Sequence, residues 1–445
     1  MNNTVDMTQG SPVKHILLFS VPMLIGNIFQ QVYNLVDSII VGKFVGANAL
    51  GAVGATSSIT FFFFALCNGI GSGGGIITSQ SFGKGDGKMV KSCIANTGYI
   101  MMAFPFAVGI LAFFLARPLL SLLSTPDIII DDAVIYMQVM AVGLLFVSLY
   151  NFVSSMLRAL GDSKTPLYFL IFSCFLNVGL DLLFVCVFSL GVFGAGIATL
   201  IAQFIAGAIC LIYAFRYNPY FKLTKEDLRF NSNVAGSALR LGIPLSLQFS
   251  LIAISTMALQ RVVNSFGEIT VAAFTATSRI EQLVHQPYQT LSSSLATFCG
   301  QNYGARKSDR VIEGYKKSVL VMVIFTVIIV PCMQLFGTEI SSWFVDDAQV
   351  IAMGSKALRI TSLFYVFLGM IYVIRGILNG VGDAFFAMLN GIVEVVGRFT
   401  VPILMTSVMG IGLWGIWWSV GVVWGISGLT AWFRYLSQKK KICAL

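Results

Sequence analysis

The chain has 445 residues, of which 57% are hydrophobic and only 11% are charged, and its net charge is +9. Because soluble proteins carry about 25% charged residues, this composition excludes an ordinary soluble domain. The lysines and arginines lie in short loops between apolar runs, which indicates a membrane protein and argues against a nucleic-acid partner.

Twelve apolar runs have about the 20-residue length that crosses a bilayer. The first run continues past Val41 without a small-residue cleavage site, so we expect a retained span and not a signal peptide. The predicted spans lie near residues 15–42, 48–80, 92–116, 133–157, 165–188, 194–215, 237–265, 270–299, 315–337, 350–374, 385–408 and 413–435.

The loops between these runs alternate in charge. Basic clusters fall at residues 84–91, 158–164, 216–229, 306–310 and 439–441, whereas most intervening loops are acidic or neutral. By the positive-inside rule, both termini are expected in the cytoplasm, which an even number of spans permits. We therefore expect a multi-pass protein of the plasma (cytoplasmic) membrane, with the lipid bilayer as its partner.

The chain repeats its own landmarks at an offset near 221 residues. Residues 80–84 (QSFGK) return as residues 301–305 (QNYGA), and Leu160-Gly161-Asp162 returns as Val381-Gly382-Asp383. Duplicated membrane halves are typical of secondary transporters. We predict an all-α membrane protein with two six-helix lobes related by a pseudo-two-fold axis along the membrane normal. The predicted parts are an N-lobe (1–215), a linker (216–236), a C-lobe (237–435) and a basic tail (436–445).

Two aspartates stand alone in predicted spans. Asp37 is the only charged side chain between His15 and Gly42, and Asp181 is the only one between Thr165 and Phe215. A charge at the centre of a membrane helix costs about 2.5–3.5 kcal/mol on insertion scales, so such residues usually face a bundle interior and serve a function.

Polar side chains share a helical face with these acids at three- and four-residue spacing. This pattern predicts a hydrated pocket formed by three helices, although the smaller polar groups could instead only hydrogen-bond helices together. The stripes are Asn27, Gln30, Asn34 and Asp37; Ser173, Asn177 and Asp181; Thr199 and Gln203. We hypothesise that Asp37 and Asp181 take up a coupling cation. We expect this cation to be a proton and consider Na⁺ as the alternative.

The second half carries acids and bases together. Glu281 and His285 share one helical face, and Glu394 and Arg398 share another. Internal pairing of Glu394 with Arg398 is the favoured interpretation. The alternatives are a polar wall of a substrate cavity or a proton relay through His285.

Enzymatic and metal-binding motifs are missing from the sequence. Eight cysteines lie mostly singly in apolar runs, and no HExxH, phosphate-loop or GxSxG motif occurs. The glycine run 71–75 lacks a following Lys-Ser/Thr and predicts close helix packing. We expect no enzyme, no cofactor and no firm metal site.

Four segments together resemble the multidrug and toxic compound extrusion (MATE) family, in its branches with N-lobe aspartates. They are residues 36–42 (VDSIIVG), 80–83 (QSFG), 158–162 (RALGD) and 177–181 (NVGLD). The resemblance implies a cation-coupled exporter of amphipathic organic cations with a V-shaped cavity and alternating access. It implies coupling at Asp37, Asn177, Asp181 and Thr199, and a hinge at Pro22. The acids that another branch carries in its seventh and tenth helices are absent, which argues against a C-lobe cation site.

Several assignments stay open at this level. The expected substrate cavity draws on Gln30, Asn34, Gln203, Glu281, His285, Glu394 and Arg398, and we expect a monomer. A lipid-linked oligosaccharide flippase of the same superfamily is the main alternative, and a membrane channel or receptor is another. At the 221-residue offset, Asp37 aligns with Ala258 and Asp181 with Pro402, so we expect only one half to bind the driving ion.

Overall fold

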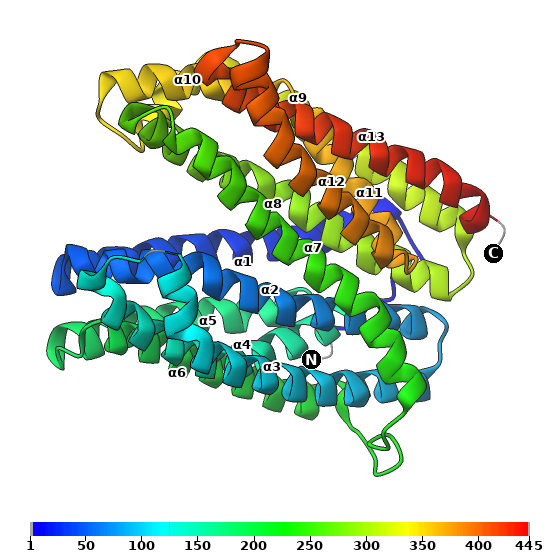
Figure 1. The fold of residues 1–445 in the computed structure, drawn as a ribbon. Coiled ribbons are helices and arrows are strands. Elements are labelled where there is room, and N and C mark those ends of the chain that lie inside the picture. Colours follow the sequence, from blue (N-terminus) through cyan, green and yellow to red (C-terminus); the bar gives the residue numbers. More distant parts are fainter. Residues whose placement is uncertain (1–2, 124, 444–445) are drawn as a thin grey trace. The chain divides into compact units, whose positions relative to one another are not determined.

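A computed structural model describes residues 3–123 and 125–443, and within them it contains thirteen α-helices and no strand. The helices are α1 (Pro12–Ile40), α2 (Ala47–Gly83), α3 (Gly87–Leu122), α4 (Asp127–Ala159), α5 (Lys164–Asp181), α6 (Gly191–Tyr217), α7 (Ser232–Asn264), α8 (Glu268–Gly304), α9 (Ser308–Ser342), α10 (Ala348–Ser362), α11 (Tyr365–Gly380), α12 (Ala384–Ile403) and α13 (Gly415–Cys443). Figure 1 shows their order along the chain.

The predicted membrane spans are confirmed as helices, and one of them is bent. Ten helical segments of the described chain are long and apolar enough to cross a membrane, and the pair α10 and α11 forms an eleventh that bends by 53°. The span predicted near 350–374 is thus present as a bent helix pair, and the sequence did not predict the bend. The one predicted span that is missing from this count is α8. It is 37 residues long, but it is less apolar than the others because it carries charged and polar residues in its middle.

Three helices continue into short π-helical segments. η1 (Val41–Val45) follows α1, η2 (Leu182–Val187) follows α5, and η4 (Leu404–Val408) follows α12. π-helical turns are rare and occur often at functional sites, because the extra residue per turn redirects side chains. Asp181 lies immediately before η2, and Asp37 lies one turn before η1.

The chain divides into two compact units. The first comprises Met1–Asp6 and Val21–Ser250, and the second comprises Met7–Ser20 and Leu251–Leu445. One crossing between units falls at Ser20–Val21, beside Pro22 inside α1, and another falls within α7. The lobe boundaries drawn from the sequence remain a prediction.

Glycines allow helices of the first unit to pack at very short distances. A Cβ on Gly73 would lie 2.4 Å from the backbone nitrogen of Gly242 in α7, and one on Gly74 would lie 2.2 Å from Thr97 in α3. The glycine run 71–75 therefore serves close helix packing, as its sequence predicts.

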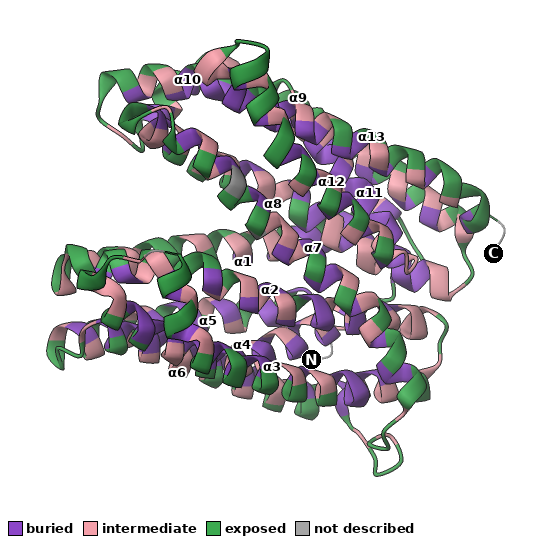
Figure 2. Ribbon diagram, in the orientation of Figure 1, coloured by how far each residue is buried: buried purple, intermediate pink, exposed green. Residues whose placement is uncertain are grey.

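Large apolar side chains cover the outside of the helices. Phe114 is 74% exposed and Val327 is 65% exposed, although both belong to apolar helices. Figure 2 shows exposed residues along the outer helix faces and buried ones where neighbouring helices meet. This inside–outside pattern is that of a protein whose surrounding solvent is lipid.

The short segment before α1 is held at both ends by hydrogen bonds. In the first unit, the Val5 amide donates to the Leu160 carbonyl (3.1 Å), next to Gly161 at φ +85°. In the second unit, the Met7 amide donates to Gln301 Oε1 (2.9 Å), and Arg310 Nη2 donates to the Met7 carbonyl (3.0 Å). The repeated motifs at 160–162 and 301–305 thus act as docking points for this segment.

The loop between α6 and α7 contacts α3 through a hydrogen bond and an ion pair. Tyr99 donates from its hydroxyl to the Leu228 carbonyl (2.7 Å), and Lys91 Nζ lies 3.7 Å from an Asp227 oxygen. Hydrogen bonds from the Thr224 amide and hydroxyl, with a contribution from Lys91, hold the pKa of Asp227 below its ordinary value. The polar stretch predicted as a linker is therefore an ordered loop.

We predict that Gly161→Ala destabilises the protein by at least about 1 kcal/mol, because an alanine disfavours the left-handed conformation. Its Cβ would also lie 2.2 Å from the Val5 carbonyl oxygen. Gly54→Ala is the matched control, since no atom lies within 4 Å of its added Cβ. Thermal unfolding in detergent should show a lower Tm for Gly161→Ala alone; an equal Tm for both variants would contradict the assigned contact.

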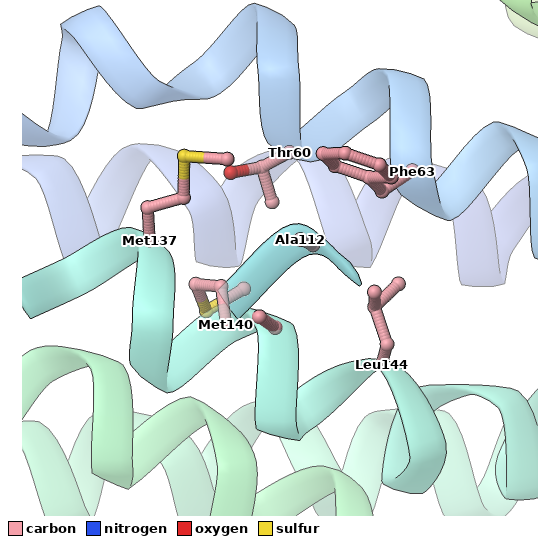
Figure 3. A pocket seen from close by; sticks show the side chains of 7 residues that line it. Thr60, Phe63, Ala112, Met137, Met140 and Leu144 are labelled. Atoms are coloured by element: carbon pink, nitrogen blue, oxygen red, sulfur yellow. The ribbon is translucent and has the colours of Figure 1, made fainter. Parts of the chain in front are cut away.

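A small void of about 10 Å³ lies between α2, α3 and α4 (Figure 3). The Thr60 hydroxyl lies beside the end of the Met137 side chain, and its buried oxygen has no hydrogen-bond partner among the described residues. The remaining walls are apolar, and a buried water needs two to four polar partners. This void is therefore a packing defect of the first unit and not a ligand site.

We predict that Thr60→Val raises the free energy of unfolding by about 1 kcal/mol, because it removes an unpaired buried hydroxyl at constant volume. Thr56→Val on the same helix should have the opposite sign, since the Thr56 hydroxyl donates to the Val53 carbonyl (2.8 Å). Chemical or thermal unfolding measures the stability of both variants. A loss of stability in Thr60→Val as well as in Thr56→Val would refute the prediction.

Candidate functional site

The two isolated aspartates meet in the first unit. Asp37 of α1 and Asp181 of α5 approach closely enough for a hydrogen bond between their side chains. Asp181 is fully buried, and one carboxyl oxygen of each residue (Oδ1) has no partner among the described residues. Two carboxylates this close repel one another when both are ionised, so a proton on one of them stabilises the arrangement.

Asn177 and Thr199 extend this acid pair into a network. With its amide oriented to satisfy its neighbours, Asn177 donates from Nδ2 to Asp181 Oδ2 (3.1 Å). Its Oδ1 then accepts from Thr199 Oγ1 (3.3 Å) and from the Thr199 amide (3.2 Å). The amide orientation follows from the hydrogen-bonding pattern. The four residues predicted as the coupling site are therefore adjacent in space, while their role in coupling stays a prediction.

Two tyrosines that the sequence analysis did not select surround the acids. Tyr33 and Tyr136 are both electrostatic neighbours of Asp37 and Asp181. Tyr33 lies one turn before Asp37 in α1, so helical spacing could have identified it. Tyr136 belongs to α4, and nothing in the sequence signals that α4 contributes to the site.

The polar residues of the first unit that were predicted for the substrate cavity do not all lie in the helix interior. Gln203 is buried in α6, one turn from Thr199, whereas Gln30 and Asn34 lie on the exposed side of α1. Pro22 lies within α1 without interrupting the helix. The assignments of these residues to a substrate cavity and to a hinge remain predictions.

The predicted ion pair between Glu394 and Arg398 is wrong, because Glu394 has a different partner. Glu394 pairs with Arg375 of α11 and not with Arg398, and both paired side chains are only 6% exposed. Arg375 also donates to Asn390 Oδ1 from Nε (3.0 Å) and Nη2 (2.7 Å). The sequence gives no signal for Arg375 as the partner of Glu394, because spacing along one helix cannot identify a partner on another helix.

Arg398 instead approaches the polar residues of α8. Its guanidinium is an electrostatic neighbour of both Glu281 and His285. The His285 ring lies 5.6 Å from the ring of Trp424 and 6.1 Å from that of Tyr372. Glu281, His285 and Arg398 thus come together within the second unit, and His285 is also an electrostatic neighbour of Glu394.

The family model for MatE matches the chain twice, at residues 22–183 and at residues 244–404. The chain belongs to the MatE family. Both matches fall on the two halves that the internal repeat predicts, so the MatE unit is duplicated in this chain. The multi-pass membrane architecture predicted from the sequence agrees with this membership.

Relatives match the MatE chain over nearly its whole length. It is 33% identical over 435 residues to the probable multidrug resistance protein YpnP of Bacillus subtilis, covering 97% of this chain and 96% of that protein. It is 23% identical to the multidrug export protein MepA of Staphylococcus saprophyticus, covering 95% and 93% of the two chains.

Solved MatE-type structures share the fold. A MATE crystal structure in the straight conformation superposes with a TM-score of 0.92 at 22% identity, covering 99% of both chains. Another in the bent conformation superposes with a TM-score of 0.92 at 22% identity, covering 98% of both chains. These similarities establish the fold of two six-helix lobes.

We predict that breaking the Arg375–Glu394 pair on one side, by Arg375→Met or Glu394→Leu, costs about 3–5 kcal/mol, because each change leaves a buried charge unpaired. The double variant should recover part of that loss, because no charge remains. Asp131→Asn should change stability by less than about 1 kcal/mol, because it breaks an exposed pair with Arg117. Thermal unfolding of these variants measures the coupling energy between Arg375 and Glu394. If the losses of stability from Arg375→Met and Glu394→Leu simply added in the double variant, the predicted coupling would be contradicted.

Proposed function

We propose that this protein exports amphipathic organic cations in exchange for protons, by alternating access across the plasma membrane. Both termini then lie in the cytoplasm, and a single chain suffices. The observation that carries the proposal is the contact between the Asp37 and Asp181 carboxyl groups among the helices of the first unit. The names of the relatives, multidrug resistance and multidrug export proteins, support drugs as the substrate class.

We infer a proton as the coupling ion, because two carboxyl groups in contact can share one proton between them. A proton shared by the two acids fits this arrangement without further ligands.

Exchange follows if the proton and the organic cation compete for the same negative charge. A bound cation stabilises the ionised acids, whereas a proton neutralises them, so each ligand weakens the other's binding. Aromatic side chains near the acids, such as Tyr33, can add cation–π attraction for an organic cation. Transport requires in addition that the two states of the protein bind these ligands with different affinities.

We expect a proton gradient to drive dye efflux from proteoliposomes that contain the wild-type protein. Asp37→Asn and Asp181→Asn should reduce gradient-driven efflux to the level of protein-free liposomes, because a neutral amide cannot exchange a proton. Asp132→Asn is the matched control, since Asp132 is an exposed acid at the beginning of α4.

The same liposomes under a sodium gradient at constant pH distinguish the two ions. The proposal predicts no efflux above background in that arm. Efflux driven by sodium alone, or undiminished proton-driven efflux in both aspartate variants, would show that the acid pair is not a proton-coupling site.

A further inference from the structure

At one end of the second unit, five exposed lysines have no hydrogen-bond or ion-pair partner among the described residues. They are Lys316 and Lys317, near the beginning of α9, and Lys439, Lys440 and Lys441, at the end of α13. Figure 2 shows the last turns of α13 as mostly exposed. These ammonium groups are therefore available to a ligand from outside the protein.

A contact between two tyrosines places both groups of lysines at the same level of the unit. The rings of Tyr315 in α9 and Tyr435 in α13 lie 4.2 Å apart. Lys316 and Lys317 follow Tyr315 directly in α9. Lys439 lies one turn beyond Tyr435 in α13. Tyrosine is enriched at the boundary between lipid and water, where the long side chain of lysine can reach the headgroups.

On α13, two of the lysines continue an apolar stripe that faces lipid. Leu429, Phe433 and Leu436 are exposed and share one face, at spacings of four and three residues. Lys439 and Lys440 follow Leu436 by three and four residues, so they extend the same face by one turn. A lipid whose acyl chain lies on this stripe would bring its headgroup to these two lysines.

The beginning of α9 repeats this arrangement in the opposite chain direction. Leu320, Ile324 and Val327 are exposed on one face of the helix. Lys316 and Lys317 precede Leu320 by four and three residues, so they lie on that face as well. Two helices that contact one another thus each carry a lysine pair immediately outside a lipid-facing stripe.

Other basic side chains at this end of the unit bind groups of the protein itself. Lys307 Nζ donates a hydrogen bond to the Thr8 carbonyl (2.9 Å). Arg434 of α13 pairs with Asp383 (2.8 Å). The lysine pairs of α9 and α13, in contrast, hold no described part of the chain.

The ligand must match both the lysines and the apolar stripes. Asp309 and Glu313 are the acids on this part of α9, and the five lysines outweigh them, so the surface is basic. Lysine clusters at the ends of membrane helices attract anionic lipid headgroups, and each lysine raises the affinity by about fivefold. A free phosphate ion leaves the stripes without a partner, whereas an anionic phospholipid has a phosphate for the lysines and acyl chains for the stripes.

We propose that the lysine pairs of α9 and α13 form a binding site for an anionic phospholipid. Its headgroup contacts Lys316, Lys317, Lys439 and Lys440, and its acyl chains lie on the adjacent apolar stripes. The site requires only that the protein is embedded in a membrane. It does not rest on the exchange of drugs for protons, so a failure of either proposal leaves the other intact.

The test titrates the purified full chain in uncharged detergent with phosphatidylglycerol and counts bound lipids by native mass spectrometry. The combined changes Lys316→Gln, Lys317→Gln, Lys439→Gln and Lys440→Gln should weaken binding of the first lipid by at least about tenfold. Arginine at the same four positions should preserve binding, because the positive charge remains. Glu313→Gln should strengthen it, since a negative charge one turn from Lys316 and Lys317 is removed.

A matched control removes the same charge from four exposed lysines of the first unit, by Lys84→Gln, Lys88→Gln, Lys222→Gln and Lys225→Gln. This control should leave the affinity nearly unchanged. An equal loss of affinity in both quadruple variants would show a general effect of net charge and overturn the site. Phosphatidylcholine that binds as tightly as phosphatidylglycerol, or displacement of the lipid by equimolar inorganic phosphate, would also overturn it.

Discussion

Two carboxyl groups in contact inside an apolar helix bundle cannot both be ionised without a severe electrostatic cost, and this constraint organises the first unit. Asp37 and Asp181 come from α1 and α5, and the contact draws Asn177 and Thr199 into one network. A proton, or a positive charge that replaces it, is needed to hold the arrangement together. The same requirement makes the network responsive to ions and to cationic ligands.

The duplicated scaffold explains why the acids can be asymmetric. Both halves match the MatE family, and both use the same turn motifs, with left-handed glycines at Gly161 and Gly382. In the first half, Gly161 receives the segment before α1, whereas in the second half the adjacent Asp383 pairs with Arg434 (2.8 Å). Equivalent backbone turns therefore make different side-chain contacts in the two halves. The buried polar side chains of the two halves also differ from each other.

Sequence reasoning recovered the features that depend on spacing along one helix. Apolar run length located the helices, and three- and four-residue spacing put polar side chains on one face of each of three helices. The family resemblance implied that Asp37, Asn177, Asp181 and Thr199 form one site, and the structure places them together. Sequence reasoning failed where the answer depends on which helices are neighbours: Tyr136 and Arg375 reach their sites from other helices, and Glu394 was given the wrong partner. The break between α10 and α11 was also missed, because no proline or polar run marks it.

Proton-coupled export by this protein depends on one proton held between Asp37 and Asp181, and proton release on ligand binding measures that proton most directly. Purified protein in weakly buffered, sodium-free detergent solution is mixed with a transported organic cation, and a pH indicator counts the protons released. Wild type should release more protons per bound cation than Asp181→Asn, at equal saturation with the ligand. Equal proton release from the two proteins would show that the acid pair does not hold the exchanged proton.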